Sequence, residues 1–184
     1  MKTSTTSIKQ SKNRNPASGP IVRCSWASPL GPMTLAATSQ GLAGAWFNGQ
    51  KHMPATEAWP EQSDHPVLLQ AQVQLGEYFA GERHLFDVPL DPLGGTVFQQ
   101  QVWQALLAIP AGSTTSYGAL AQRIGRPAAV RAVGAAVGRN PLTILVPCHR
   151  VVGADGSLTG YAGGLERKTA LLQREQAPAA TISA

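Results

Sequence analysis

The sequence predicts an α+β protein in which a small strand-rich part precedes a mainly helical part. Within the 184 residues, short apolar segments separated by turn residues fill the region 21–47, which is typical of antiparallel strands. From residue 97 onwards, apolar residues recur at the spacing of an α-helix. The region 88–96 between the two parts holds two prolines and two glycines, which indicates a linker.

The first part is expected to contain a small sheet and one helix. Residues 33–37 and 42–47 are apolar, lie between turn signals and are predicted to be strands. Asp64 is positioned to cap a helix that covers residues 65–80, where apolar side chains recur at helical spacing. Gly81 is expected to end this helix.

The second part is expected to be built mainly from helices. Phe98, Val102 and Ile109 lie on one stripe, so a helix is predicted up to Pro110, which stops it. Two short helices across a tight Gly/Pro turn then have the pattern of a helix-turn-helix. These two helices are predicted at 117–124, where Ser116 opens the helix, and at 128–139. They are followed by predicted strands at 144–146 and 150–152, a glycine-rich loop at 153–164 and a last helix at 165–176.

The predicted helix at 128–139 has an unusual exposed face. At 100° per residue, Val130, Val133 and Val137 share the buried side. The other side is almost wholly alanine and glycine with one arginine, whereas surface helices usually carry Glu, Lys and Gln. Close packing against another helix is one explanation, but further arginines nearby favour contact with nucleic acid. The residues of this face are Ala128, Arg131, Ala132, Ala135 and Gly138.

Charge is distributed unevenly along the chain. The net charge of +5 divides into +4 for residues 1–20, −4 for residues 21–96 and +5 for residues 97–184. A polyanion is therefore expected to meet the helical part. The predicted organisation is a flexible basic tail at 1–20, an α+β domain at 21–93, a helix-turn-helix domain at 94–177 and a frayed tail at 178–184.

Composition excludes several classes of protein. The chain is 43% hydrophobic and 14% charged, which is too apolar for general disorder. No run approaches the roughly 18 apolar residues of a membrane helix, and the polar first twenty residues do not resemble a secretory signal. Cys24 and Cys148 are too few for a disulfide scaffold, and no zinc-ligand spacing occurs. A soluble, cytoplasmic protein without a metal or other cofactor is expected.

Cys148 is the candidate nucleophile. A lone cysteine in an apolar run such as residues 144–152 is most often a small buried hydrophobe. Here His149 follows directly, and a Cys/His pair favours formation of a thiolate. Adjacent side chains in a regular strand point to opposite faces. The histidine is therefore expected to reach the sulfur only through distorted backbone or a bridging water.

The last predicted helix offers two glutamates that are candidates to orient the histidine. Its leucines, Leu165, Leu171 and Leu172, define the predicted buried face. Glu175 lies within about 40° of that face, whereas Glu166 points almost opposite. A buried carboxylate needs a partner, so Glu175 is preferred as the partner of the histidine. A frayed helix end in solvent is the alternative.

The segment Pro147-Cys148-His149-Arg150-Val151 resembles the active-site motif of the O6-alkylguanine-DNA alkyltransferases, also called methylated-DNA–protein-cysteine methyltransferases. The resemblance covers roughly residues 20–177, and it is specific because accessory segments occur in the same order and spacing. These segments are Phe98-Gln99-Gln100-Gln101-Val102-Trp103, Ser116-Tyr117-Gly118, Arg131-Ala132-Val133-Gly134, Asn140-Pro141 and Gly160-Tyr161.

The resemblance implies a ribonuclease H-like first domain and a winged-helix second domain. It implies DNA repair by irreversible, single-turnover transfer of an alkyl group from O6-alkylguanine, and from O4-alkylthymine, to Cys148. The implied partner is double-stranded alkylated DNA, which a monomer binds in the minor groove while the damaged nucleotide is flipped out of the stack. No cofactor takes part in this reaction.

The resemblance also implies roles for individual residues. Cys148 is the nucleophile, His149 is a base acting through a water, and Glu175 orients the histidine. Tyr117 crowds the target phosphate and assists protonation of the leaving guanine, and Arg131 replaces the flipped nucleotide in the stack. Asn140 braces the active-site turn. The implied DNA-binding residues are Arg131, Ala132, Ala135, Gly138, Tyr117, Ser116 and Arg126. The implied substrate pocket holds Pro147, Val151, Tyr161 and Ala162, and Ala162 stands where other members have a hydroxyl residue.

Two other classes of function remain open. A non-catalytic, damage-binding relative is one, and the presence of Cys148 argues against it. A cysteine hydrolase is the other; adjacent nucleophile and base suit it poorly, and hydrolysis does not explain the helix that carries Arg131. The first part of the chain shows no chemistry, so it is expected only to buttress the site, with Cys24 as a core thiol.

Overall fold

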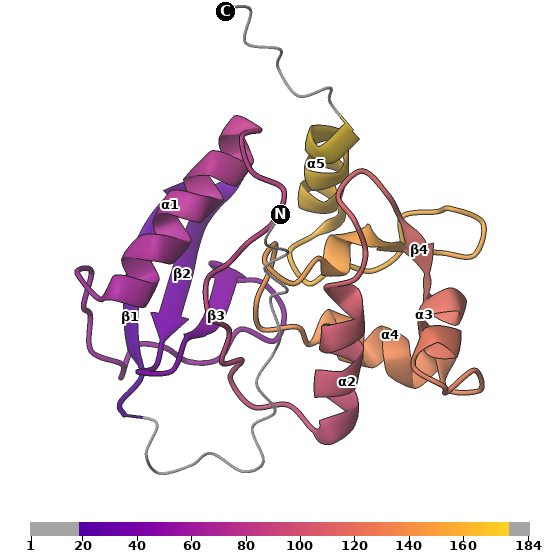
Figure 1. Cartoon of the computed structure of the whole chain (residues 1–184), viewed down its shortest axis with the longest axis horizontal. Helices are drawn as coiled ribbons and strands as arrows, with labels where there is room; N and C mark the ends of the chain where they lie inside the picture. Colours follow the sequence, from indigo (N-terminus) through magenta and orange to yellow (C-terminus); the bar gives the residue numbers. More distant parts are fainter. Residues whose placement is uncertain (1–18, 177–184) are drawn as a thin grey trace, which may run out of the picture.

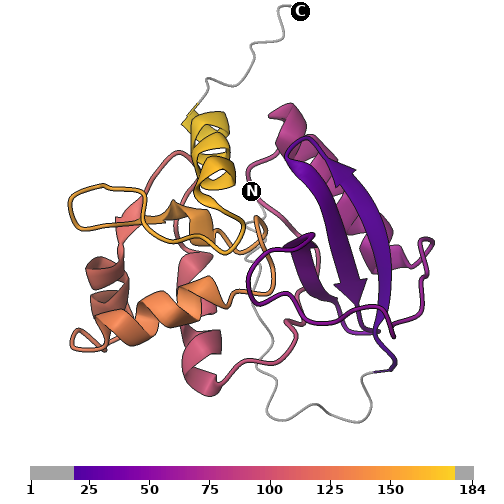
Figure 2. The same ribbon diagram turned by 180° about the vertical axis from the view of Figure 1, so that it is seen from behind.

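The first half of the chain forms a three-stranded antiparallel sheet with one helix. A computed structural model describes residues 19–176, so the predicted tails at 1–20 and 178–184 lie almost wholly outside it. Strands β1 (Val22–Ser28), β2 (Gly31–Ala37) and β3 (Leu42–Phe47) are ordered β1-β2-β3. Helix α1 (Pro66–Ala80) lies along this sheet in both views of the ribbon (Figures 1 and 2). The predicted strands and helix are confirmed.

The ends of α1 confirm one prediction and correct another. Gly81 ends the helix with a φ of 83°, a left-handed conformation that glycine adopts without strain. The predicted cap by Asp64 is wrong, because His65 occupies the cap position and no side chain there makes a capping hydrogen bond. Pro66 stands in the first turn, where a missing backbone N–H costs nothing.

The predicted linker at 88–96 is not a free connection. Leu90 pairs with Leu42 of β3, and the Leu42 amide donates to the Pro89 carbonyl at 2.8 Å. Val88 and Leu90 are buried in the core. This segment therefore extends the edge of the sheet before the chain enters the second half, and its prolines stand where a ladder can lose a donor.

The second half is helical, as predicted, with one small two-stranded sheet. Helices α3 and α4 contact one another across a turn that contains Gly125, whose φ is 71°. Strand β4 pairs in parallel with β5, which follows the segment of Cys148. The elements are α2 (Val97–Leu106), β4 (Thr115–Ser116), α3 (Tyr117–Arg123), α4 (Val130–Gly138), β5 (Val151–Val152) and α5 (Leu165–Gln176).

The segment 141–146 fixes the two halves to each other. It is not the predicted strand but a turn, in which Ile144 has a φ of 76°. The Ala45 amide of β3 donates to the Pro141 carbonyl at 2.8 Å, and the Thr143 amide donates back to the Ala45 carbonyl at 3.0 Å. These contacts dock the approach to the active-site segment directly onto the first sheet.

Core packing joins both halves and corrects three details of the helices. One hydrophobic cluster includes side chains of the sheet, of α1 and of α2 to α5. Helix α2 ends at Leu106, although Ile109 beyond it remains buried. Val130 and Leu165, expected on buried faces, are 38% and 47% exposed, because each stands at the first turn of its helix where the chain leaves the core. None of the described helices is long and apolar enough to cross a membrane.

Candidate active site

Cys148 and His149 lie on a single turn of 3-10 helix, Cys148–Arg150. The sequence-based argument expected distorted backbone if the two side chains were to cooperate, and this turn provides it, because neighbours on a 3-10 turn do not point to opposite faces as they do in a strand. Pro147 precedes the turn, and β5 follows it. Both side chains are buried, Cys148 at 6% and His149 at 0% exposure.

Asn140 braces this turn from the end of α4. Its side-chain Nδ2 donates to the Val146 carbonyl at 2.8 Å and to the Cys148 Sγ at 3.1 Å. Its Oδ1 accepts from the Leu142 amide at 2.9 Å. A single buried amide therefore holds the segment that leads into the turn and contacts the sulfur.

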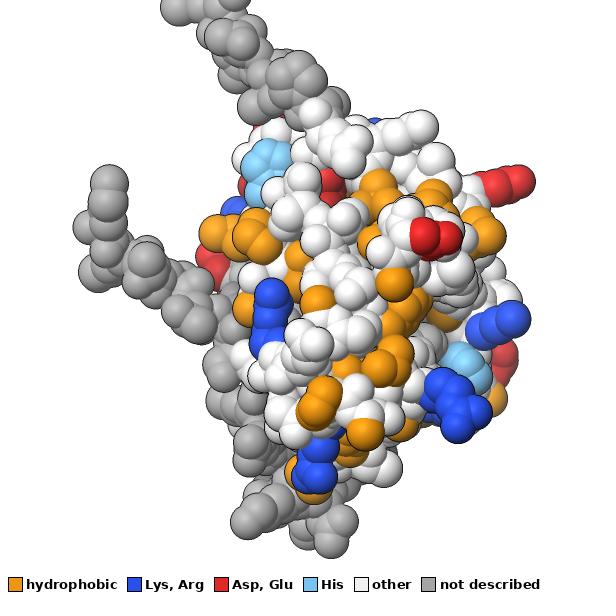
Figure 3. Space-filling view, turned by 90° about the vertical axis from the view of Figure 1, so that its right-hand side faces the viewer, with side chains coloured by type: hydrophobic (Ala, Val, Ile, Leu, Met, Phe, Trp, Pro, Cys, Tyr) orange, Lys and Arg blue, Asp and Glu red, His pale blue; other side chains and the backbone are white. Residues whose placement is uncertain are grey.

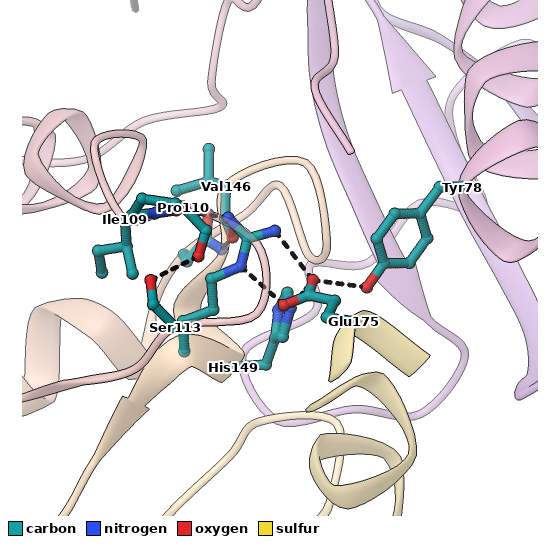
Figure 4. A network of polar contacts seen from close by, with 9 residues as sticks. Tyr78, Ile109, Pro110, Ser113, Val146, His149 and Glu175 are labelled. Carbon is teal, nitrogen blue, oxygen red and sulfur yellow. Dashed lines mark hydrogen bonds and ion pairs between the residues drawn. The ribbon is translucent and has the colours of Figure 1, made fainter. Parts of the chain in front are cut away.

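The carboxylate of Glu175 is the centre of a buried polar network (Figure 4). Its Oε1 lies 2.7 Å from Nε2 of His149, so the predicted pairing of these two residues is confirmed. The Arg150 guanidinium donates to both carboxylate oxygens at 2.9 Å, and the Tyr78 hydroxyl donates to Oε1 at 2.8 Å. Glu166, by contrast, is exposed on the other side of α5, as expected.

These contacts determine the charge of the pair. Burial raises the pKa of Glu175, but hydrogen bonds from His149 and Arg150 and the charge of Arg150 outweigh burial and hold that pKa far below its usual range. The carboxylate is therefore ionised, so Nε2 of His149 carries the ring proton and donates it to Glu175. Burial lowers the pKa of His149, and the partly compensating hydrogen bond to Glu175 does not reverse this.

The other ring nitrogen of His149 is available as a base. Its Nδ1 is buried and has no hydrogen-bond partner among residues 19–176. With the proton held on Nε2, Nδ1 presents a lone pair. Burial raises the pKa of the Cys148 thiol, although the Asn140 hydrogen bond and the charge of Lys168 partly offset this. These effects favour the thiol over the thiolate at rest, and the unpartnered Nδ1 of the neighbouring histidine is a candidate base.

Lys168 holds the segments around the site together from within the core. It is fully buried on α5, and burial lowers the pKa of its ammonium group. Its Nζ donates to the Val151 carbonyl at 2.6 Å, to the Thr159 carbonyl at 3.0 Å and to the Gly160 carbonyl at 3.4 Å. One side chain therefore ties β5 and the glycine-rich loop to α5.

A cavity of about 350 Å³ opens above Cys148. Its size and largely apolar lining match those of sites for small organic ligands. Burial raises the pKa of Tyr161 well above its usual range, and its hydroxyl has no hydrogen-bond partner among the described residues. The lining residues are Lys51, His52, Tyr117, Gly134, Val137, Gly138, Cys148, Thr159, Gly160, Tyr161 and Ala162.

Two residues expected in this pocket lie elsewhere. Pro147 lines a separate cavity of about 230 Å³ behind the turn, because the turn that brings Cys148 forward directs Pro147 away. Val151 is fully buried in β5, is not among the residues that line the cavity, and accepts a hydrogen bond from Lys168 at its carbonyl. Tyr161 and Ala162 do line the cavity, as predicted.

The small-residue face of α4 is exposed beside the cavity, as predicted. Arg131, Ala132 and Ala135 are exposed, and Gly138 is half-buried and lines the cavity itself. Figure 3 looks onto this half of the molecule and shows Lys and Arg side chains around an apolar surface in the lower part of the view. Arg126 is exposed in the turn before α4, and the Ser116 hydroxyl caps α3 by accepting from the Ala119 amide at 3.1 Å.

Several residues of the site were missed by the sequence argument, among them Arg150, Lys168, Tyr78 and Lys51. Arg150 and Lys168 carried a signal, since a charge within a buried run and a lysine one helical turn before Leu171 both need buried partners. Tyr78 and Lys51 carried none, because each lies far along the chain from the groups it meets. Tyr117, which was predicted, lies at the cavity with its hydroxyl 3.1 Å from the Thr159 carbonyl.

The fold and the site together define a class of protein. A helix-turn-helix exposes a narrow face, and a buried cysteine with a histidine and a carboxylate lies at the base of a cavity beside that face. Such an arrangement belongs to proteins that carry out cysteine chemistry on a nucleic acid.

The chain belongs to the 6-O-methylguanine DNA methyltransferase family. Residues 21–92 match the ribonuclease-like domain of that family, and residues 97–177 match its DNA binding domain. The methylated-DNA–protein-cysteine methyltransferase of Mycobacterium tuberculosis H37Rv is 52% identical over 152 residues, which cover 83% of this chain and 90% of that protein. The protein of the same name from Mycobacterium leprae is 49% identical over 158 residues, covering 85% and 93%.

Solved structures give the same family. The crystal structure of M. tuberculosis O6-methylguanine methyltransferase superimposes with a TM-score of 0.79 at 48% identity, covering 89% of this chain and 96% of that one. The structure of M. tuberculosis OGT in complex with DNA superimposes with a TM-score of 0.77 at 49% identity, covering 84% and 92%. The two-domain α+β fold expected from the sequence is therefore confirmed.

Proposed function

We propose that Cys148 removes the alkyl group from O6-alkylguanine, and from O4-alkylthymine, in flipped-out nucleotides of double-stranded DNA, once per protein molecule. The observation that carries this proposal is the buried thiol at the base of a cavity next to the small-residue face of α4. The O6 atom of guanine is buried in the base stack, so the nucleotide must leave the helix to reach such a thiol.

The chemical step follows from the contacts of His149. The proton of the Cys148 thiol passes, through a bridging water, to Nδ1 of His149, whose Nε2 is held by Glu175. The thiolate then attacks the alkyl carbon, a C–S bond forms, and the C–O6 bond breaks with its electron pair going to guanine. The hydroxyl of Tyr117, at the cavity, protonates the leaving base, and Tyr117 is reprotonated through solvent by the proton that His149 took from the thiol. The resulting thioether has no path back to a thiol.

The surface next to the cavity fits a minor groove. Alanine and glycine let the backbone of α4 approach the duplex closely, and the exposed Arg131 is long enough to fill the space that the flipped nucleotide vacates. Arg126 and the first turn of α3 at Ser116 are placed to contact phosphates. Because repair acts at any sequence, phosphate contacts are expected to outweigh base readout.

The expected setting of the reaction is the cytoplasm, with the protein acting as a monomer. Both cysteines are free and buried, which suits a reducing compartment.

Intact mass spectrometry tests the reaction. After incubation with duplex DNA that contains O6-methylguanine, the protein is expected to gain the mass of one methyl group and no more, with the adduct on the peptide of Cys148. Cys148→Ala is expected to keep DNA binding and lose transfer. Several turnovers per molecule, or an adduct on Cys24, would contradict the proposal.

A further inference from the structure

The cavity above Cys148 has a wall that comes from the first half of the chain. Lys51 and His52, in the loop after β3, line it together with α4 and the glycine-rich loop. Both residues are exposed while they line the cavity, so they stand at its rim rather than at its base. Cys148 is buried and marks the base. The domain expected only to buttress the site therefore reaches its entrance.

The loop that carries these two residues is held in place. The Lys51 amide donates to the Ala162 carbonyl of the glycine-rich loop at 3.1 Å. Buried Gln50 accepts at Oε1 from the Phe47 amide at 2.9 Å and from the Thr143 hydroxyl at 3.2 Å. His52 adopts a φ of 63°, a left-handed conformation that costs a residue other than glycine about 1 kcal/mol. The surrounding contacts thus hold the backbone of Lys51 and His52 in this conformation, which fixes the positions of their Cα atoms at the rim.

The charge of the rim is not balanced within the cavity. Lys51 carries a full positive charge and His52 offers ring nitrogens, while none of the residues that line the cavity is acidic. Neither side chain makes a hydrogen bond or an ion pair with another residue that the structure describes, so both are free to bind a ligand. A cation at the rim of a concave site attracts an anionic group of the ligand.

The orientation of the substrate says which anionic group that is. The alkyl carbon on O6 must meet the Cys148 sulfur at the base of the cavity. The sugar is attached at N9, on the opposite side of the purine from O6, so the sugar and its phosphates remain at the entrance. Given the function proposed above, we propose that Lys51 and His52 form a binding subsite for a phosphate of the flipped nucleotide itself.

Small substrates test this subsite without the rest of the DNA. The rate constant for benzylation of Cys148 is measured with O6-benzylguanine, with its 2′-deoxynucleoside and with the 5′- and 3′-monophosphates of that nucleoside. The wild-type protein is expected to react about 3- to 10-fold faster with one monophosphate than with the nucleoside, the range for one or two partly exposed charge-assisted contacts. Lys51→Met and His52→Gln should each reduce this preference, and Lys51→Arg should retain it.

A matched control removes a charge elsewhere in the same half. Arg83→Ala deletes one positive charge that is paired with Glu77 and does not line the cavity, so the phosphate preference should stay unchanged. On duplex DNA, Lys51→Met should also lower the dependence of binding on salt by about one counterion.

The outcomes separate this subsite from the reaction on which it rests. If the wild-type protein shows no preference for either monophosphate, or if Lys51→Met keeps the full preference, the subsite does not exist. Equal losses on the free base would mean that the two residues only shape the cavity, which also overturns the subsite. Failure of the wild-type protein to react with any of the four compounds would instead reject the proposed reaction.

Discussion

The two halves of the molecule contribute to the site in different ways. The helical half supplies the three residues that the proposed reaction uses (the trio), with Cys148 and His149 on one turn and Glu175 on one helix. The sheet half supplies single side chains from separate elements, Tyr78 from α1 and Lys51 from the loop after β3. The sheet half thus holds no reacting atom, yet it contacts both the catalytic carboxylate and the cavity entrance.

This difference predicts where substitutions act. Changes in the trio should remove the chemical step on every substrate, because each member transfers or positions a proton. Changes in the sheet half should adjust the basicity of the trio or the entry of substrate, and leave a working reaction. The following experiments either sharpen this division or break it.

The largest effect is expected at Glu175. Glu175→Gln removes the negative charge that keeps the His149 proton on Nε2, so transfer should slow by about 10²- to 10⁴-fold, while DNA affinity changes little. Glu166→Gln on the exposed face of α5 is the matched control and should leave the rate within about twofold. Single-turnover rates with duplex substrate measure both. Equal losses of rate in the two variants would show that Glu175 has no special role, and would contradict the division between the two halves.

Lys168 is expected to matter for the stability of the helical half. Lys168→Met keeps an unbranched apolar stem but leaves three carbonyls, of β5 and the glycine-rich loop, without their donor. The free energy of unfolding should fall by about 3 kcal/mol. Gln173→Met, on an exposed position of the same helix, should change it by less than about 0.5 kcal/mol. Urea unfolding measures the difference; a midpoint that moves no more than that of the control would contradict it.

Arg131 should separate flipping of the nucleotide from chemistry. Arg131→Ala removes a charge and a space-filling side chain from the exposed face of α4. Transfer from firmly paired O6-methylguanine in a duplex should fall by about 30-fold, which corresponds to part of the few kcal/mol that extrusion costs. The loss should be smaller on single-stranded DNA, where extrusion costs less, and nearly absent with free O6-benzylguanine.

Measurement at one fixed salt concentration keeps phosphate contacts comparable between these substrates. If Arg131→Lys restored most activity and all DNA substrates suffered alike, charge alone would explain the residue. A comparable loss on the free base would place Arg131 in support of the cavity, and its role in flipping would have to be abandoned.

Much of the helical half could be read from the sequence because its signals are local. Cap and turn residues placed α3 and α4, and the 100° rule alone separated Glu175 from Glu166 on α5. The same rule applied to Lys168 would have placed it on the buried face as well. The prediction failed in the backbone around Ile144: residues 144–146 are apolar like a strand, but they form a turn in which the Val146 amide donates back to the Leu142 carbonyl at 2.8 Å.

The contribution of the sheet half could not be read in this way. Tyr78 lies on an apolar stripe of α1, where a tyrosine is indistinguishable from any other core aromatic. Its partner Glu175 lies 97 residues further on, and only the tertiary packing of α5 and of segment 141–146 against the sheet half brings the two together. In the sequence, nothing distinguishes Lys51 from other surface lysines, and its position at the cavity becomes visible only when the fold places the glycine-rich loop beside it.

The smallest predicted effect, at Tyr78, is therefore the sharpest test of the division. The Tyr78 hydroxyl donates to the same Oε1 atom of Glu175 that accepts from His149, so it draws negative charge away from that contact. Tyr78→Phe removes the hydroxyl alone. The carboxylate should then hold the His149 proton more tightly and raise the pKa of the imidazole.

The direction of the pH effect follows from the state of the histidine. In the wild-type protein, burial lowers the pKa of His149 below 6.5, with smaller contributions from the charges of Arg150 and Lys168. The imidazole of His149 is thus neutral at any pH above its lowered pKa. The rate of transfer should fall only when the pH decreases through that pKa. In Tyr78→Phe this acid limb should move up in pH, so that the rate on the limb falls about fivefold, the worth of one hydrogen bond of about 1 kcal/mol, while the rate on the plateau above the limb changes little.

Free O6-benzylguanine is the substrate for this measurement, because DNA binding then adds no pH dependence of its own. Phe79→Leu is the control: it disturbs the aromatic ring that packs edge-on against Tyr78, 5.4 Å between centroids, without touching Glu175. Both variants should lose stability, but only Tyr78→Phe should shift the acid limb. If the limb stays in place in both, Tyr78 is a packing residue, and the sheet half supports the catalytic trio without tuning it.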